Sequence, residues 1–208
     1  MVTLENLFKF ISSLQAVYSE KKLYLSELDS AIGDGDHGVN MARGFDAVVA
    51  NWKANPPSNC EDAFKSISAS LIKTVGGASG PLYGTMFRKM SLAVGKKTEF
   101  GLDEWIDGIS KGIDGIMLIG KAQKGDKTMI DAWIPALEAL KTAQNDRKTF
   151  AEALRECAVA AKNGAEATIP LIAKKGRASY LGERSIGHQD PGATSSAMMA
   201  AVAADTLI

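Results

Sequence analysis

Apolar residues recur at helical spacing along most of this chain, and no segment shows the strict alternation that marks a half-buried strand. The first twenty residues illustrate the pattern, because Leu4, Leu7, Phe8, Ile11 and Leu14 fall at the i, i+3, i+4, i+7 positions of one helix face. Since this spacing dominates, the sequence predicts an all-α fold.

The same pattern predicts eight helices, at approximately residues 4–18, 40–51, 60–74, 81–94, 103–119, 128–141, 149–174 and 193–208. Asn59 precedes the third helix as a predicted N-cap, and Pro81 suits the first position of the fourth. Thr149 and Glu152 have capping-box spacing at the start of the seventh. Pro135 falls inside the sixth helix, where we expect a kink.

Most of the glycines lie in a few segments near the ends of these predicted helices. Of 20 glycines, 13 lie in four segments, residues 33–38, 76–84, 120–125 and 176–192. A helical bundle needs only short polar connections, whereas glycine lets the backbone approach a ligand closely. We therefore predict one domain spanning residues 1–208, an eight-helix antiparallel bundle or barrel with a ligand site in the loops at one end.

Three aspartates, Asp29, Asp34 and Asp36, lie within eight residues of one another in the first of these segments. Carboxylates this close repel each other unless a cation is bound, and ligand sets made only of carboxylates select magnesium, manganese or calcium over zinc. The calcium-binding EF-hand pattern fails here, because its glycine and terminal glutamate are not in place. The alternative is an acidic, solvated turn.

The second and third segments offer backbone donors. Residues 75–84 expose several N–H groups beside a helix start, with the Ser79 hydroxyl among them, which suits a phosphate, although a plain helix–helix turn fits the same pattern. Residues 120–128 approach the P-loop pattern, but Asp126 precedes Lys127 and the preceding segment reads as helix. We therefore reject a P-loop, although this loop could still contact a bound nucleotide.

The last segment is long for a connection in a helical bundle, and long ordered loops are usually functional. Arg177 and Arg184 could clamp phosphate or ribose, and Asp190 could accept a ribose hydroxyl or a metal-bound water. The only histidines are His37 and His188. Each could be a phosphohistidine or a general base, but simple hydrogen bonding is the favoured interpretation, so we assign no catalytic residue within this chain.

Lys and Arg together equal Asp and Glu at 24 each, so the net charge is zero. That balance argues against a broad surface for nucleic acid or anionic lipid. No apolar run reaches the ~20 residues of a membrane span, and the first residues lack the features of a secretion signal. The two cysteines show no CxxC spacing and are expected to be reduced thiols. We therefore expect a cytoplasmic protein with no nucleic-acid or membrane partner.

Residues 33–41, 76–84 and 179–192 together resemble the L-subunit family of bacterial dihydroxyacetone kinases, and the resemblance covers essentially the whole chain. It implies an eight-helix antiparallel barrel that binds ADP or ATP with two Mg²⁺ ions held by Asp29, Asp34 and Asp36. The nucleotide contacts that it implies are at His37, Gly38, Val39, Asn40, Ala78, Ser79, Gly120, Met129, Arg177, Asp190, Pro191 and Gly192.

The resemblance also implies that the steps of the reaction are shared among different subunits. ADP would remain bound as a cofactor, a phosphohistidine subunit M would rephosphorylate it to ATP, and a subunit K would present dihydroxyacetone. Two alternatives stay open, an ATP-dependent kinase subunit for dihydroxyacetone or erythrulose and a regulatory module that senses nucleotide state. The sequence also leaves open whether the chain forms a homodimer.

Overall fold

Nine α-helices and one 3-10 helix make up most of the chain in the computed structural model, which describes all 208 residues. The α-helices are α1 (Leu4–Glu20), α2 (Lys22–Ile32), α3 (His37–Ala54), α4 (Cys60–Thr74), α5 (Ser79–Val94), α6 (Leu102–Gly120), α7 (Ile130–Asn145), α8 (Phe150–Glu166) and α9 (Pro191–Thr206). The 3-10 helix is η1 (Arg177–Ser185). The predicted all-α fold class is confirmed.

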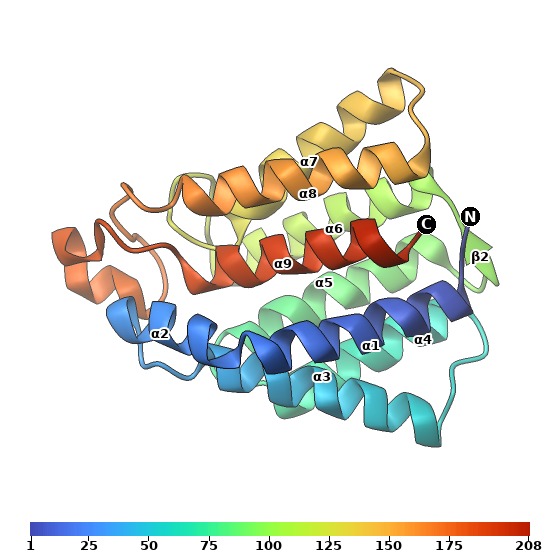
Figure 1. Ribbon diagram of the computed structural model, residues 1–208, viewed down its shortest axis with the longest axis horizontal. Helices are drawn as coiled ribbons and strands as arrows, with labels where there is room; N and C mark the ends of the chain where they lie inside the picture. Colours follow the sequence, from blue (N-terminus) through green and yellow to red (C-terminus); the bar gives the residue numbers. More distant parts are fainter.

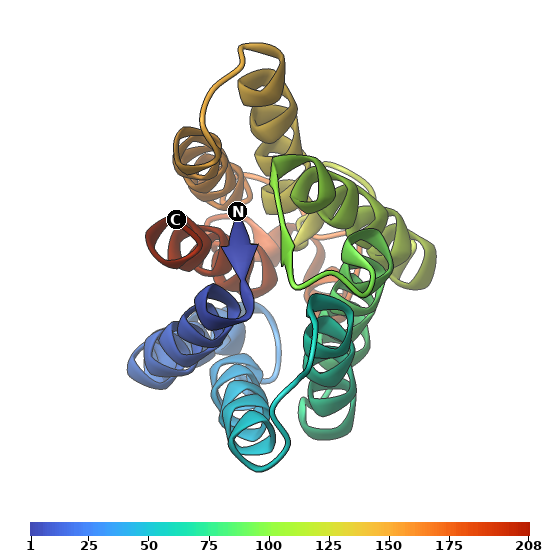
Figure 2. The same cartoon turned by 90° about the vertical axis from the view of Figure 1, so that its right-hand side faces the viewer.

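The helices form a closed ring of antiparallel neighbours, which Figure 2 shows from the end that carries the chain termini. Each helix from α3 to α8 packs against the next one in sequence, and α9 closes the ring against α1. The short α2 continues the direction of α1 toward the opposite end of the barrel (Figure 1). Because α1 and α2 share one position, nine α-helices fill eight positions around the ring.

One apolar core runs through this ring and contains most of the large side chains. Aromatic rings fill the end near the termini, where Phe100 stacks on Trp105 with a centroid separation of 6.2 Å and Phe64 packs against Phe100 at 5.9 Å. A two-residue antiparallel pairing closes the same end, in which β1 (Val2–Thr3) lies against β2 (Glu99–Phe100). The sequence patterns did not predict these strands, because two residues are too short for an alternating pattern.

Several helix limits differ from those predicted. No helix was predicted at α2, and α3 begins at His37 rather than near residue 40. Pro81 is the third residue of α5 rather than the first. The largest error is at α8, which ends at Glu166 instead of near residue 174. There Thr168 is bound to distant residues, because its carbonyl accepts a hydrogen bond from the Lys127 ammonium and its hydroxyl accepts the N–H of Asp190, each at 2.9 Å.

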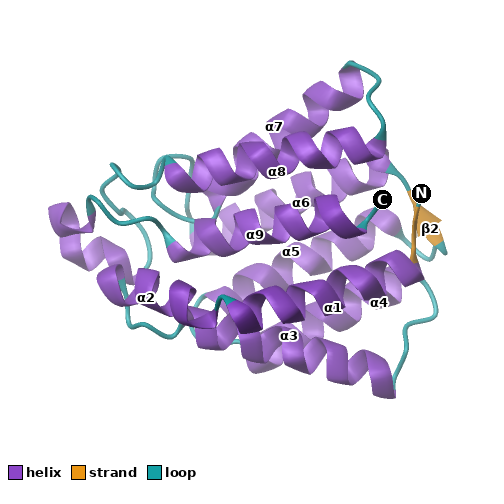
Figure 3. Ribbon diagram, viewed as in Figure 1, coloured by secondary structure: helices purple, strands orange, loops and turns teal.

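All four glycine-rich segments meet at one end of the barrel, the left end in Figure 3. In an antiparallel ring, alternate helices must start at the same end, and here those helices are α3, α5, α7 and α9. The predicted gathering of these loops is therefore present in the structure. None of the helices has both the length and the apolar character of a membrane-spanning segment.

Candidate functional site

A pocket of about 600 Å³ opens among the loops at this end, and all four glycine-rich segments contribute to its walls. Twelve of the fifteen residues predicted for the site line it: Asp29, Asp34, Asp36, His37, Ala78, Ser79, Gly120, Met129, Arg177, Asp190, Pro191 and Gly192. Gly38, Val39 and Asn40 do not. The structure thus brings together segments that are separated by as much as 160 residues.

The three residues outside the pocket follow His37 in the first turn of α3. Gly38 packs so closely on α2 that an added Cβ would lie 2.0 Å from the carbonyl oxygen of Lys22. Val39 is exposed, and the buried Asn40 accepts a hydrogen bond from Arg43 at 2.5 Å. Gly38 and Asn40 therefore shape the start of α3 rather than the pocket surface.

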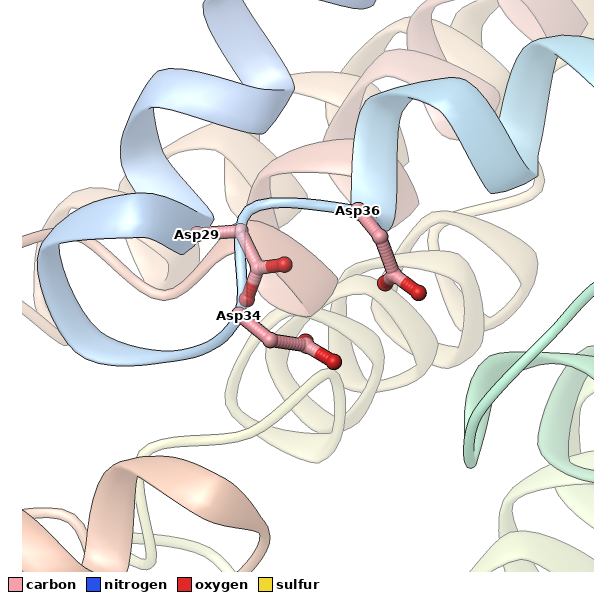
Figure 4. A group of neighbouring side chains, drawn as sticks. All are labelled: Asp29, Asp34 and Asp36. Carbon is pink, nitrogen blue, oxygen red and sulfur yellow. The ribbon is translucent and has the colours of Figure 1, made fainter.

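The aspartates form the acidic part of the pocket. Asp29 comes from the last turn of α2, whereas Asp34 and Asp36 come from the loop that leads into α3. One carboxylate oxygen from each of them lies within 4.8 Å of the other two, and the three side chains point into the same space (Figure 4). The Asp29 carboxylate also accepts the backbone N–H of His37 at 3.1 Å, which fixes the carboxylate against the start of α3.

Electrostatics at this cluster favour a bound cation. Burial raises the pKa of Asp29 above its usual value, and the charges of Asp34 and Asp36 raise it further. A divalent cation between the carboxylates would remove this mutual repulsion. Because the donors are all oxygens, the cluster fits Mg²⁺ better than a softer metal.

Opposite charge is available from the helix starts. The first residues of α3 and α5, His37 and Ser79, line the pocket, as do Met129 just before α7 and Pro191 at the start of α9. At α3 the first N–H is taken by the Asp29 carboxylate, and at α7 it is taken by the Thr128 hydroxyl. No side chain caps α5, so its first N–H groups, at Ser79 and Gly80, remain free for a ligand. Helix starts carry partial positive charge and bind phosphate readily. The pocket therefore combines a cation site with several anion donors.

A buried polar network lies beneath these helix starts. His37 bonds to the hydroxyl of Ser79 through Nδ1 at 3.1 Å and to that of Ser195 through Nε2 at 2.9 Å. The Tyr83 hydroxyl bonds to Ser195 at 2.7 Å and to Ser196 at 2.9 Å. Burial lowers the pKa of His37 to about 4, so its ring is neutral at physiological pH.

The His37 ring is therefore held between two hydroxyls. A neutral imidazole carries one ring proton, so one nitrogen donates and the other accepts. When Nδ1 carries the proton, it donates to Ser79 and leaves the Ser79 proton free for a ligand. This arrangement supports the hydrogen-bonding interpretation of His37 over the phosphohistidine, while His188 is exposed and does not line the pocket.

Two cationic residues at this end of the barrel, Arg177 and Lys127, have different environments. Arg177 reaches across the pocket mouth, where its Nη2 lies 2.9 Å from a carboxylate oxygen of Asp34. Lys127, which occupies the place of a P-loop lysine in sequence, is buried, and its ammonium bonds to backbone carbonyls. The rejection of a P-loop therefore agrees with the structure, in which this lysine has a different environment.

Asp190 is buried at the start of α9, and its carboxylate accepts the N–H of Ala193 at 2.6 Å. Burial raises its pKa to about 7. Its side chain caps the helix, and its place on the pocket wall keeps it available for a ligand contact.

Tyr83, Ser195 and Lys127 were absent from the predicted site, although Tyr83 and Lys127 line the pocket. Tyr83 is in α5 and Ser195 is in α9, 112 residues further along the chain, so no local spacing links them. Lys127 follows a glycine-rich segment, but its partners are main-chain carbonyls more than 40 residues away, which leave no trace in the side-chain sequence.

Comparisons with known proteins add independent information. Residues 31–205 match the family model described as the DAK2 domain. The chain is 44% identical over 179 residues to the Escherichia coli protein named PEP-dependent dihydroxyacetone kinase, ADP-binding subunit DhaL, covering 86% of this chain and 85% of that protein. It is 40% identical over 199 residues to the PTS-dependent dihydroxyacetone kinase ADP-binding subunit DhaL of Lactococcus lactis, covering 96% of this chain and 95% of that subunit.

Among solved structures, the fold is similar to the dihydroxyacetone kinase of C. freundii determined with AMP-PNP and Mg²⁺, with a TM-score of 0.73 and 25% sequence identity. The match covers 97% of this chain but 33% of that kinase, so the chain spans about a third of the length of that relative.

Proposed function

The chain belongs to the DAK2 domain family, and from that premise we propose that it is the nucleotide-binding subunit of a dihydroxyacetone kinase. ADP is retained in the pocket as a cofactor. A phosphohistidine on a partner subunit M converts it to ATP, and the terminal phosphoryl group then passes to dihydroxyacetone on a partner subunit K.

One observation carries this proposal. The carboxylates of Asp29, Asp34 and Asp36 lie within 4.8 Å of one another on the wall of the same pocket that α3, α5, α7 and α9 face with their N-termini. A nucleoside diphosphate with its cation needs this combination, because acidic groups must hold the metal while N–H groups hold the phosphate oxygens.

Each part of the pocket has a role in this account. Bound Mg²⁺ neutralises phosphate charge during transfer, and we propose two such ions on the three carboxylates. The free N–H groups at the start of α5 and the Ser79 hydroxyl hold the β-phosphate. Arg177 and residues 190–192 orient the nucleoside side, with Gly120 and Met129 on the adjoining wall. The remaining predicted contacts, Gly38, Val39 and Asn40, lie in the first turn of α3, where Gly38 and Asn40 are buried and Val39 is exposed.

The partners supply the remaining chemistry. The neutral, doubly hydrogen-bonded His37 is not placed to deprotonate a sugar hydroxyl or to carry a phosphoryl group. Phosphoryl transfer depends mostly on positioning and charge stabilisation. We therefore assign the acceptor hydroxyl and its base to subunit K, and the exposed pocket mouth to docking with both partners.

Two related functions make different predictions. An ATP-dependent ketose kinase subunit would exchange ADP for ATP quickly during turnover. A regulatory module would bind nucleotide without accepting a phosphoryl group. The match to separate ADP-binding subunits over 85% and 95% of their length supports the cofactor form over both.

The test is reconstitution of phosphate flux. Purified protein, loaded with one equivalent of Mg-ADP, is mixed with subunits K and M and a phosphohistidine donor, and dihydroxyacetone phosphate is measured. We expect turnover without free nucleotide only when all three subunits are present. The chain alone with ATP and Mg²⁺ should leave dihydroxyacetone unphosphorylated, and robust phosphorylation by the isolated chain would contradict the proposal.

A further inference from the structure

Lys127 is fully buried, with 1% of its surface exposed, and its ammonium is surrounded by backbone oxygens. Its Nζ lies 2.9 Å from the carbonyl oxygen of Thr168, 3.3 Å from that of Ile169, 3.1 Å from that of Leu171 and 2.7 Å from that of Ser185. Lys127 forms no salt bridge, so every hydrogen bond of its ammonium is to a backbone carbonyl. Lysine is almost never buried so completely without a specific set of partners.

All four carbonyls belong to the connection between α8 and α9. Three follow α8 directly, and the fourth is at the end of η1, the 3-10 helix that begins with Arg177. The Ser185 hydroxyl strengthens the same closure, because it donates to Gly182 at 2.6 Å and accepts the N–H of Ala173 at 2.9 Å. One ammonium therefore ties together both ends of the segment that bears Arg177.

The backbone at Lys127 is itself fixed by the loop that precedes α7. Its φ of 62° lies in the left-handed region, which is uncommon for a residue other than glycine. The Asp131 carboxylate accepts the N–H groups of Gly125 at 2.5 Å and Thr128 at 2.8 Å and fixes the turn around it. Strained backbone persists where its surroundings over-determine it, often at ligand sites. The loop before α7 therefore holds Lys127 in a fixed position, and through Lys127 it stabilises the α8–α9 connection.

We propose that Lys127 is a positioning residue for the nucleotide: its ammonium acts as a built-in monovalent cation among four carbonyls and holds Arg177 over the pocket mouth. At that mouth Arg177 already lies 2.9 Å from Asp34. The effect on nucleotide binding rests on the function proposed above, whereas the seating of the ammonium among the carbonyls does not.

The carbonyl arrangement supports a charged lysine. Burial lowers the pKa of Lys127 and the charge of Asp190 opposes that effect; hydrogen bonds to the ammonium also favour the charged form. Removing the side chain would leave oxygens arranged for a small cation with hydrogen-bond donors. An added ammonium ion should therefore replace the lost group.

The experiment compares Lys127→Ala with Lys124→Ala, a matched change at an exposed lysine of the same loop that does not line the pocket. A fluorescent ADP analogue with Mg²⁺ reports affinity and dissociation rate. Hydrogen bonds to a charged group are strong enough that Lys127→Ala should weaken binding by about tenfold to a hundredfold, mainly through faster dissociation. Lys124→Ala should change it less than about twofold.

Added ammonium chloride should restore most of the lost affinity in Lys127→Ala, at an ionic strength held constant with tetramethylammonium chloride, which has no N–H donors. A structural defect elsewhere would not respond to ammonium. Unchanged binding in Lys127→Ala, or a loss that ammonium leaves uncorrected, would overturn the proposal.

A measurement on the wild-type protein keeps the test decisive if the variant does not fold. Nitrogen-detected magnetic resonance of nucleotide-free protein should show one lysine ammonium whose protons exchange slowly with water. Absence of a protected ammonium would refute the seating among carbonyls. Failure of the wild type to bind Mg-ADP would refute the proposed function instead, so the two failures can be told apart.

Discussion

A few atoms decide the chemistry of the pocket, namely the carboxylate oxygens of three aspartates, the Ser79 hydroxyl and the His37 ring that is hydrogen-bonded to it. Asp29, Asp34 and Asp36 converge as their spacing predicted. The Ser79 hydroxyl lies at the first position of α5, where a phosphate donor was expected. What the sequence did not reveal is the hydrogen bond between Ser79 and His37, which couples the Ser79 hydroxyl to a buried network.

Replacing Asp34 or Asp36 by Asn removes an anionic ligand with little change in size. Loss even of an outer partner of a metal ligand costs about tenfold to a hundredfold in affinity, so each variant should bind Mg-ADP at least about a hundredfold more weakly. Circular dichroism should remain that of a helical protein. Calorimetry measures the affinity, with Asp107→Asn on the exposed face of α6 as the control. Unaltered affinity in both variants would remove the metal assignment.

Ser79→Ala removes one hydrogen-bond donor to phosphate and one partner of His37. A hydrogen bond to a charged group contributes roughly 1.5–3 kcal/mol, so affinity or transfer rate should fall about tenfold to a hundredfold while the protein stays folded. Titration with Mg-ADP and single-turnover transfer measure the two effects. A change smaller than twofold in both would place Ser79 outside the site.

At the scale of elements, helices with a capping residue or a clear apolar face in the sequence were predicted well. Helices without these features were not. Asn59 caps α4 by accepting the N–H of Asp62, and Thr149 with Glu152 forms the capping box that opens α8, both as predicted. The helix α2 was missed because its Lys22–Ile32 sequence buries only Leu25 and Ile32, too few for a clear apolar face. The end of α8 depends on tertiary contacts around residue 168, which no local pattern encodes.

The capping box at α8 gives a test of stability away from the pocket. Thr149→Ala removes the hydroxyl that accepts the N–H of Glu152, and the loss of such a cap typically costs about 1 kcal/mol in the free energy of unfolding. Chemical denaturation should show this decrease, with Mg-ADP affinity unchanged. Thr142→Ala on the exposed face of α7 is the control and should stay within about 0.5 kcal/mol of the wild type.

At the scale of the whole molecule, antiparallel closure explains why one end binds ligand. Alternate helices start there and bring partial positive charge, while the acidic loop between α2 and α3 brings the carboxylates. The sequence predicted the all-α class and the gathering of the glycine-rich loops. It could not predict the pairing of segments around Lys127 or His37, because those contacts join residues 40 to 160 positions apart through main-chain atoms and buried hydroxyls.

The rim of this end should govern docking rather than nucleotide binding. Lys121 and Arg184 are exposed and do not line the pocket. Substituting either by Ala should reduce phosphate flux with subunits K and M by roughly fivefold, the equivalent of the ~1 kcal/mol that an exposed charge pair contributes. The loss should be larger at low ionic strength. A flux equal to that of the wild type, or weaker ADP binding by the isolated variant than by the isolated wild type, would contradict this role.

The central claim is that the pocket binds ADP through a cation on Asp29, Asp34 and Asp36. Its most direct test is calorimetric titration of ADP into nucleotide-free protein, once with Mg²⁺ and once with EDTA. The account predicts tight, one-to-one binding with Mg²⁺ and a loss of at least about a hundredfold in EDTA, because the carboxylates then repel the phosphates. Equal affinity in the two titrations, or no binding with Mg²⁺, would contradict it.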